Sequence, residues 1–119
     1  MKTMLWAGAM ALSLALAGPA FAQPSGTWLS QSGETKIQFK KSGGTFIGTI
    51  VWTKSGEAVG KQMVHSVKKT GDNRWSGKLW NYQNGKTYTG KMQLLSASKM
   101  KLSGCVGPIC RNQTWTKSN

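Results

Sequence analysis

Turn-forming residues recur at short intervals along this chain, and this feature most limits the folds open to it. Glycine stands in a turn-forming dipeptide at six places: Ser32-Gly33, Gly43-Gly44, Ser55-Gly56, Gly71-Asp72, Asn84-Gly85 and Gly107-Pro108. Short segments rich in β-branched and aromatic residues lie between them. This punctuation is typical of an antiparallel meander that closes into a barrel or a sandwich. The Asn84-Gly85 pair is the strongest hairpin signal and predicts a type I′ turn.

The segments between the turns predict eight strands and no helix after residue 22. The expected strands are Thr27–Gln31, Thr35–Lys41, Thr45–Lys54, Gln62–Lys69, Arg74–Tyr82, Lys86–Ser96, Lys99–Cys105 and Ile109–Lys117. Apolar and polar residues alternate in several of them, as Ile37 and Phe39 do with Lys36, Gln38 and Lys40. Such alternation is expected of strands with one buried face. The predicted fold class is therefore all-β, a small antiparallel up-and-down β-barrel of about eight strands.

The N-terminus has the pattern of a secretory signal peptide. Lys2 gives a positive start, Met4–Ala17 is apolar or small throughout, and Ala20-Phe21-Ala22 fits a cleavage site. The apolar run of 14 residues, from 4 to 17, is shorter than the ~20 needed to span a bilayer. We expect residues 1–22 to be a cleaved signal peptide and residues 23–119 to be a single β-barrel domain. This predicts a periplasmic or secreted protein with no transmembrane segment after cleavage.

The two cysteines, Cys105 and Cys110, flank the Gly107-Pro108 turn between the last two predicted strands. An exported protein meets an oxidising compartment, where cysteines form disulfides. Two cysteines allow one intramolecular pairing. We therefore expect a structural Cys105–Cys110 disulfide, and the four-residue spacing disfavours a CxxC-type redox motif.

The side chains needed for catalysis are scarce. The three acids are Glu34, Glu57 and Asp72, each directly after a glycine in a predicted turn, and the one histidine is His65. Paired carboxylates or a Ser-His-Asp arrangement need groups held in fixed relation, and these positions do not provide it. One histidine and two bonded cysteines do not make a zinc site. We expect no enzyme activity, no metal and no cofactor.

The chain is strongly basic. Without Lys2 it has 15 basic residues (16 − 1) against 3 acids, a net charge of +12. Such a charge attracts anionic surfaces, and it also keeps an exported protein soluble. The lysines are spread over nearly every predicted strand. The sequence therefore indicates an anionic envelope surface as a partner, or only a solvated exterior, and no specific nucleic acid.

Aromatic residues allow two interpretations of the barrel interior. Tryptophans remain at five positions after cleavage: Trp28, Trp52, Trp75, Trp80 and Trp115. In a barrel of eight strands the interior holds either packed side chains or one small ligand. If a cavity is present, strand alternation predicts that Trp52, Trp75, Tyr88 and Met92 line it and bind a small hydrophobic molecule.

The Gly26-Thr27-Trp28 segment resembles the Gly-x-Trp signature of lipocalins and related calycin barrels. In those folds a basic residue from the last strand packs over the tryptophan, and Arg111 stands where the resemblance places it. Gly26, Trp28 and Arg111 are therefore the expected structural signature of a lipocalin-like barrel.

A broader resemblance covers the whole mature chain. Segments including Phe46–Trp52, Trp75-Ser76-Gly77, Gly85–Tyr88 and Leu102–Trp115 are similar to exported bacterial proteins called the domain of unknown function 2147 family. The resemblance implies a lipocalin-like barrel and no particular activity. This chain departs from the family in the short 54–61 segment, and at Trp80-Asn81-Tyr82 where relatives have Tyr-Asp-Pro.

Two functions follow from these observations. The first is an exported small barrel that binds an apolar or amphipathic ligand. The alternative is an envelope interaction protein with a filled barrel, whose lysine-rich exterior binds anionic polymers or a protein partner.

Overall fold

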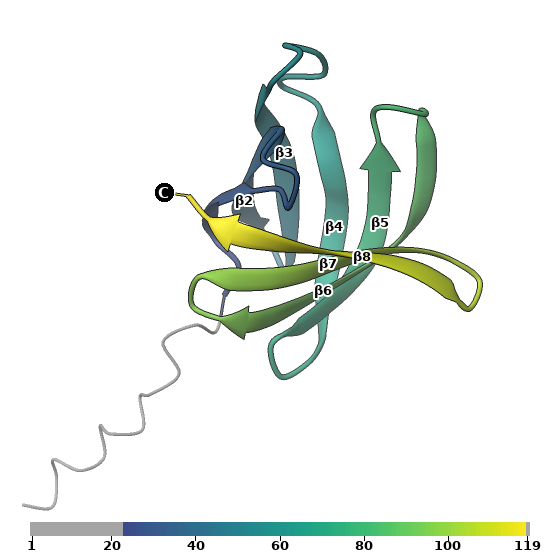
Figure 1. The fold of residues 1–119 in the computed structure, drawn as a ribbon. Coiled ribbons are helices and arrows are strands. Elements are labelled where there is room, and N and C mark those ends of the chain that lie inside the picture. Colours follow the sequence, from purple (N-terminus) through teal and green to yellow (C-terminus); the bar gives the residue numbers. More distant parts are fainter. Residues whose placement is uncertain (1–22, 119) are drawn as a thin grey trace, which may run out of the picture.

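Eight antiparallel strands follow one another along the chain in this computed structural model, which describes residues 23–118. They are β1 (Gly26–Leu29), β2 (Thr35–Ser42), β3 (Thr45–Thr53), β4 (Gln62–Gly71), β5 (Arg74–Asn81), β6 (Lys86–Ser96), β7 (Lys99–Val106) and β8 (Ile109–Lys117). Each strand pairs with the next, and β8 pairs with β1, so the sheet closes into a barrel (Figure 1). The predicted all-β, up-and-down barrel of eight strands is confirmed. The expected signal peptide lies outside the described residues.

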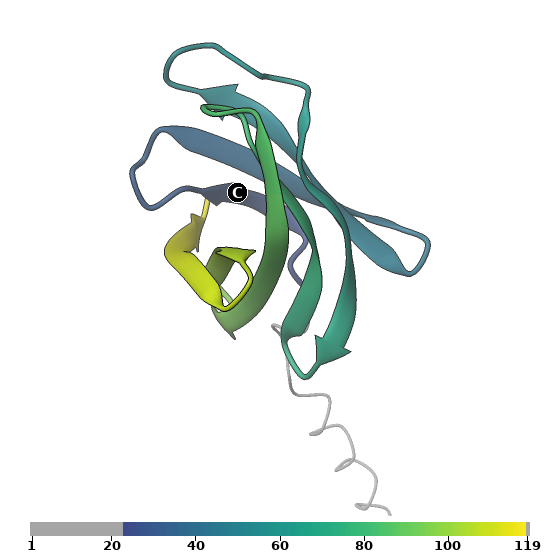
Figure 2. The same ribbon diagram turned by 90° about the vertical axis from the view of Figure 1, so that its right-hand side faces the viewer.

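Strand alternation fills the barrel with apolar side chains. The buried cluster comprises Trp28, Ile37, Phe39, Phe46, Ile50, Val64, Val67, Trp75, Leu79, Met92, Leu94, Met100, Leu102 and Trp115. The strands curve around the interior of the barrel (Figure 2), which these side chains fill. Gly77 faces inward, and a Cβ atom there would come within 2.8 Å of the His65 carbonyl oxygen on β4. A glycine is therefore required at this point of β5, where the backbone of β4 leaves no room for a side chain.

The barrel closes through a short seam. β1 has four residues, and only Trp28 and Leu29 pair with β8, opposite Lys117 and Thr116. The remainder of β8 pairs with β7 alone, and the hairpin that they form projects from the barrel (Figure 1). Two residues before this seam in β8, the backbone N–H of Thr114 donates a hydrogen bond to the Gln31 side chain at 2.8 Å. The two ends of the barrel therefore differ: one is closed by the β1–β8 pairs and the other is splayed.

Trp28 closes the end of the barrel where β1 begins. Its ring is fully buried, and its Nε1 donates a hydrogen bond to the Pro24 carbonyl at 2.9 Å. The Lys117 ammonium lies 5.3 Å from the ring centroid and donates to the Ser25 carbonyl at 2.9 Å. Gly26 has a φ of 100°, and a Cβ there would meet Lys117 Cε at 2.8 Å. The Gly-x-Trp segment thus has the packing expected of the signature.

The basic residue over Trp28 is Lys117, and the expectation that Arg111 takes this place was wrong. Register decides the matter, because Trp28 stands opposite Lys117 while Arg111 pairs with Gly104 near the far end of β8. Six residues of an extended strand separate the two basic side chains by about 20 Å. Arg111 therefore lies at the splayed end of the barrel, away from Trp28.

Replacing Lys117 with methionine tests this assignment. Lys117→Met keeps an unbranched apolar side chain beside the ring but removes the cation and its hydrogen bond to Ser25. A cation–π contact and a hydrogen bond from a charged donor lead us to expect a loss of about 1–2 kcal/mol in the free energy of unfolding by urea. Arg111→Met is the control and should change that free energy by less than about 0.5 kcal/mol. Equal losses would contradict the assignment.

The β5–β6 connection also differs from expectation. Asn81 pairs with Lys86, so four residues, 82–85, form the loop instead of the two of a type I′ turn. Only Gly85 among them has a positive φ, at 73°, and its N–H bonds to the Asn81 carbonyl at 2.7 Å. Type I′ geometry needs two consecutive residues with positive φ. The longer loop places Tyr82 and its neighbours at the splayed end.

Candidate functional site

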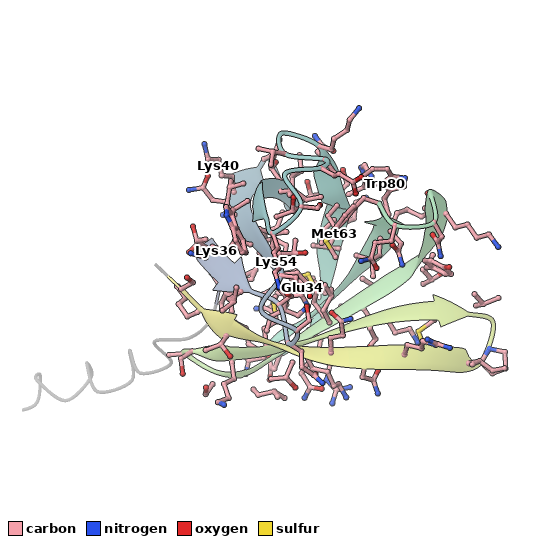
Figure 3. The ribbon with its side chains drawn as sticks, turned by 45° about the horizontal axis from the view of Figure 1, so that its top comes forward. Glu34, Lys36, Lys40, Lys54, Met63 and Trp80 are labelled. Atoms are coloured by element: carbon pink, nitrogen blue, oxygen red, sulfur yellow. A yellow bond between two sulfur atoms is a disulfide. The ribbon has the colours of Figure 1, made fainter. Side chains whose placement is uncertain are left out.

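A cavity of about 560 Å³ occupies the splayed end of the barrel, and we call it the mouth cavity. The β1–β2, β5–β6 and β7–β8 connections all contribute to its rim, because alternate connections of an up-and-down barrel lie at the same end. Figure 3 shows Glu34, Met63 and Trp80, from three different parts of the chain, around this region. Its volume falls within the ~300–1,000 Å³ typical of small-molecule pockets.

The floor of the mouth cavity is apolar. Leu79, Leu102 and Trp115 line it and belong to the buried core. Gly104 also lines it, and a Cβ there would lie only 3.1 Å from Leu79 Cδ2. The small residue at 104 lets the Leu79 side chain lie against the backbone of β7. An apolar portion of a ligand would rest on this floor.

The rim of the mouth cavity is polar and is held by hydrogen bonds within loops and by one contact between two of them. The Tyr82 and Thr35 hydroxyl oxygens lie 3.4 Å apart, which links the β5–β6 loop to the start of β2. Asn84 Nδ2 donates to the Tyr88 hydroxyl at 2.9 Å. Glu34, whose backbone N–H donates to the Ser30 hydroxyl at 3.2 Å, also lines the rim. These contacts order the side chains that a ligand would meet first.

Arg111 brings a positive charge to the same cavity. It shares a strand face with Trp115, four residues further along β8, and therefore lies on the inward side at the splayed end. Glu34 and Arg111 are the two charged residues in the cavity lining. The cavity thus combines an apolar floor with charged groups of both signs at its edge, an arrangement suited to an amphipathic molecule.

The Cys105–Cys110 disulfide stiffens one wall of the mouth cavity. The two cysteines stand opposite each other across β7 and β8, with Cα atoms 4.0 Å apart, as the sequence predicted. Beyond them, Val106 and Ile109 line the cavity while remaining 65% and 73% exposed. The bond therefore fixes the end of the hairpin that carries these apolar side chains to the rim.

The four predicted ligand-binding residues do not gather around one cavity. Tyr88 lines the mouth cavity. Trp75 and Met92 face inward as expected but are buried in the packed core, where Trp75 meets the Phe46 ring edge-on at 6.3 Å between centroids. They support the barrel and do not line its mouth.

Trp52 lies on the outside of the barrel, which corrects the expectation that it faces a cavity. Its side chain is 41% exposed, and the Lys36 ammonium lies 5.6 Å from its ring centroid. The cause is a β-bulge: Lys36 pairs with Trp52 and Ile37 with Ile50, so Val51 is an extra residue in β3. The bulge reverses the alternation after Ile50. Thr53, the residue after Trp52, therefore faces inward and is buried, while Trp52 faces outward.

The titratable side chains considered for catalysis are dispersed. Glu57 lies in the β3–β4 loop and Asp72 in the β4–β5 turn, while His65 in β4 pairs through Nδ1 with Gln62 Oε1 at 3.0 Å. Glu34 alone among the acids lines the mouth cavity, a position that its predicted turn did not reveal. Within residues 23–118, no group of three or more His, Cys, Asp or Glu side chains is arranged to hold a metal ion.

In the part of the chain that the structure describes, there is no helix of the length and apolar character that crossing a bilayer requires.

Comparison with protein families identifies relatives. The family described as "Uncharacterized protein conserved in bacteria (DUF2147)" matches residues 26–117, from the first residue of β1 to the last of β8. The chain belongs to this family. The matched range covers the barrel, the disulfide and the mouth cavity, so the family resemblance in the sequence is confirmed. Comparison with curated protein sequences gives no match.

Among solved structures, the chain is similar to one described as "Protein HP1028 from the human pathogen Helicobacter pylori belongs to the lipocalin family". The TM-score is 0.69 at 15% sequence identity, and the match covers 82% of this chain and 84% of the other. The similarity shows that the barrel of this chain is lipocalin-like in fold, in agreement with the Gly-x-Trp segment. At this identity it supports the fold alone.

Several residues of the mouth cavity were not predicted as site residues. Trp80 and Tyr82 line it from the end of β5 and the loop that follows. The signal that could have found them is their position beside the Asn84-Gly85 turn, since residues at a strand end meet the opening of a barrel. Arg111 was selected for a different role. Its inward orientation follows from alternation with Trp115 along β8.

Proposed function

We propose that this protein is an exported, non-enzymatic binding protein that holds one small amphipathic molecule in its mouth cavity. The mouth cavity itself carries the proposal: about 560 Å³, with an apolar floor and a polar rim. The packed core beneath it makes the site a preformed pocket at one end of a rigid barrel. A barrel filled to both ends, as the alternative function requires, would have no such space.

Export is part of the proposal. The disulfide supports it, because such bonds persist in oxidising compartments. Membership of a bacterial family indicates the periplasm or the exterior as that compartment. The signal-like residues 1–22 precede the barrel in the sequence.

A ligand bound in the mouth cavity would lie with its apolar part on Leu79, Leu102 and Trp115. Its polar part would face Arg111 and the hydroxyl groups of the rim. Charged and neutral hydrogen-bond donors at a pocket edge fix orientation, while apolar burial supplies most of the affinity. The proposed ligand class is therefore a small molecule with an apolar body and a hydrogen-bonding or anionic head.

Titration with N-phenyl-1-naphthylamine, an uncharged fluorescent probe, tests the proposal. We expect saturable enhancement of probe fluorescence with one site per chain. Tyr88→Ala removes an aromatic wall of the cavity and should weaken binding about tenfold, which corresponds to about 1.4 kcal/mol. Trp52→Ala removes a larger ring from the outer face and should change the affinity less than twofold. Binding that never saturates, or equal effects of the two variants, would refute the proposed site.

A further inference from the structure

A second hollow lies outside the barrel, on the face of the sheet formed by β5–β8. It has a volume of about 480 Å³ and we call it the outer groove. The strand registers carry two rows of side chains across it. These rows are Ser76–Lys91–Ser103–Asn112 and Arg74–Gln93–Lys101–Thr114. Between them runs the row of Trp75, Met92 and Leu102, which are buried in the core, so the two flanking rows face outward.

Three cations line the outer groove: Arg74, Lys91 and Lys101. Lys91 and Lys101 are diagonal neighbours on adjacent strands, whose positions lie about 7–8 Å apart. Arg74 stands in the same row as Lys101 two strands away, at about 10 Å. These side chains repel one another, and a bound anion would relieve that repulsion.

No acid balances this charge on the surrounding strands. The segment from Arg74 to Lys117, which spans β5 to β8, contains no Asp or Glu. Its basic residues are Arg74, Lys78, Lys86, Lys91, Lys99, Lys101, Arg111 and Lys117. The charged residues that line the outer groove are therefore all cations, and the acid nearest in sequence, Asp72, lies in the β4–β5 turn between the lining residues Thr70 and Arg74 and does not itself line the groove.

A partly buried hydrogen bond between Ser103 and the exposed Asn112 prepares the groove for an anion. Ser103 is only 5% exposed, and its hydroxyl donates to Asn112 Oδ1. This bond fixes the Asn112 amide with its oxygen occupied, so Nδ2 is the end left to donate to a ligand. The Ser76 hydroxyl and the Gln93 amide add donors in the same hollow. Convergent donors and cations suit the several acceptor oxygens of a phosphoryl group.

We infer that the outer groove is a second binding site, separate from the mouth cavity, for a flexible polymer that carries phosphate groups along its chain. Cations spaced across three strands, β5, β6 and β7, fit repeated charges better than a single small anion. A base-stacking mode is disfavoured because Trp75, the only aromatic residue lining the groove, is 3% exposed. The sheet face therefore recognises phosphate charge and not nucleobases.

Inorganic polyphosphate of defined length is the probe for this inference, in titrations at 0.15 M salt (about physiological ionic strength). The Lys91→Gln/Lys101→Gln variant should weaken binding at least about tenfold, or about 1.4 kcal/mol. Lys40→Gln/Lys41→Gln removes the same charge from exposed positions on β2 and should weaken binding less than about threefold. Equal weakening by the two double variants would mean that polyphosphate binding follows net charge alone. It would refute the assignment of the outer groove as the binding site.

Exchanging the side-chain nitrogen of Asn112 for an oxygen gives a sharper test. Asn112→Asp keeps the side-chain shape and the acceptor for Ser103 but replaces the Nδ2 donor with a carboxylate oxygen. We expect it to weaken polyphosphate binding at least about tenfold, and the charge-matched Lys40→Gln to have a small effect. An unchanged affinity in Asn112→Asp would exclude the groove as the site. Unaltered far-ultraviolet circular dichroism and melting would establish that each variant is folded.

Further binding measurements distinguish the outer groove from a nucleic-acid site and from the mouth cavity. A single-stranded oligonucleotide of equal charge should bind more weakly than polyphosphate, and tighter binding would overturn the preference for a polymer without bases. Tyr88→Ala, which alters the mouth cavity, should leave polyphosphate binding unchanged. The uncharged naphthylamine probe should likewise bind Lys91→Gln/Lys101→Gln normally, so that failure of one site is distinguishable from failure of the other.

Discussion

Replacing Trp28 with alanine is expected to lower the free energy of unfolding by about 3–5 kcal/mol, the usual cost of emptying a buried tryptophan site. The ring is fully buried at the closed end of the barrel. The variant also loses the hydrogen bond to the Pro24 carbonyl and leaves the Lys117 ammonium without its aromatic partner. Urea unfolding followed by circular dichroism measures the change. A barrel of this size has a modest total stability, so the variant should be largely unfolded near 37 °C.

The matched control is Trp52→Ala. It removes the same ring from the outer face, where it is 41% exposed and contacts a cation in a similar way. We expect a loss of less than about 1 kcal/mol, since an exposed cation–π pair contributes about 0.5–1 kcal/mol. Similar losses for the two tryptophans would mean that the β3 bulge does not place Trp52 outside, and the packing at both ends would need revision.

Breaking the disulfide is expected to be the second large effect. Cys110→Ser and Cys105→Ser each remove the bond, and the loss should fall at about 2–5 kcal/mol, as for native disulfides in small secreted domains. The closed loop is short, so loop entropy alone gives about 2 kcal/mol. Cys105 is 3% exposed and Cys110 is exposed. Cys105→Ser should therefore be the more damaging, because it also places a hydroxyl in a buried position.

Thermal unfolding of the oxidised and reduced wild-type protein checks the same point without a substitution. Reduction should lower the melting temperature to about that of Cys110→Ser. Reduction should also weaken binding in the mouth cavity, since the hairpin that carries Val106 and Ile109 loses its crosslink. A reduced protein with unchanged melting and unchanged binding would show that β7–β8 pairing holds the hairpin by itself.

Most of the fold could be predicted because its determinants are local. Turn residues separate the strands, and alternation such as that of Ile37 and Phe39 marks the face turned to the core. The disulfide followed from the presence of two cysteines around one turn. The Gly-x-Trp segment correctly predicted that a basic residue of the last strand packs over Trp28, although that residue is Lys117.

The errors have one physical origin, which is strand register. Counting by twos along β3 carries an inward position from Ile50 to Trp52, and one bulged residue reverses it. The choice between Arg111 and Lys117 depends on which residues of β8 pair with β1, and no local pattern states this. Pairing at a seam between chain ends is set by the closure of the whole barrel.

The mouth cavity was likewise beyond local patterns. Trp75 and Tyr88 both occupy inward positions, yet one is packed in the core and the other faces open space. What separates them is depth along the barrel axis. That depth depends on the short β1–β8 seam and on the length of the 82–85 loop.

The most direct test of the proposed function uses the tryptophan indole N–H signals in a ¹H–¹⁵N spectrum during titration with the naphthylamine probe. Ligand in the mouth cavity should shift the signals of Trp80 and Trp115, which line it, and leave those of Trp28 and Trp52 in place. The shifts should saturate at one probe per chain. Saturable binding that moves the Trp52 signal, or that moves no signal of Trp80 or Trp115, would contradict the account.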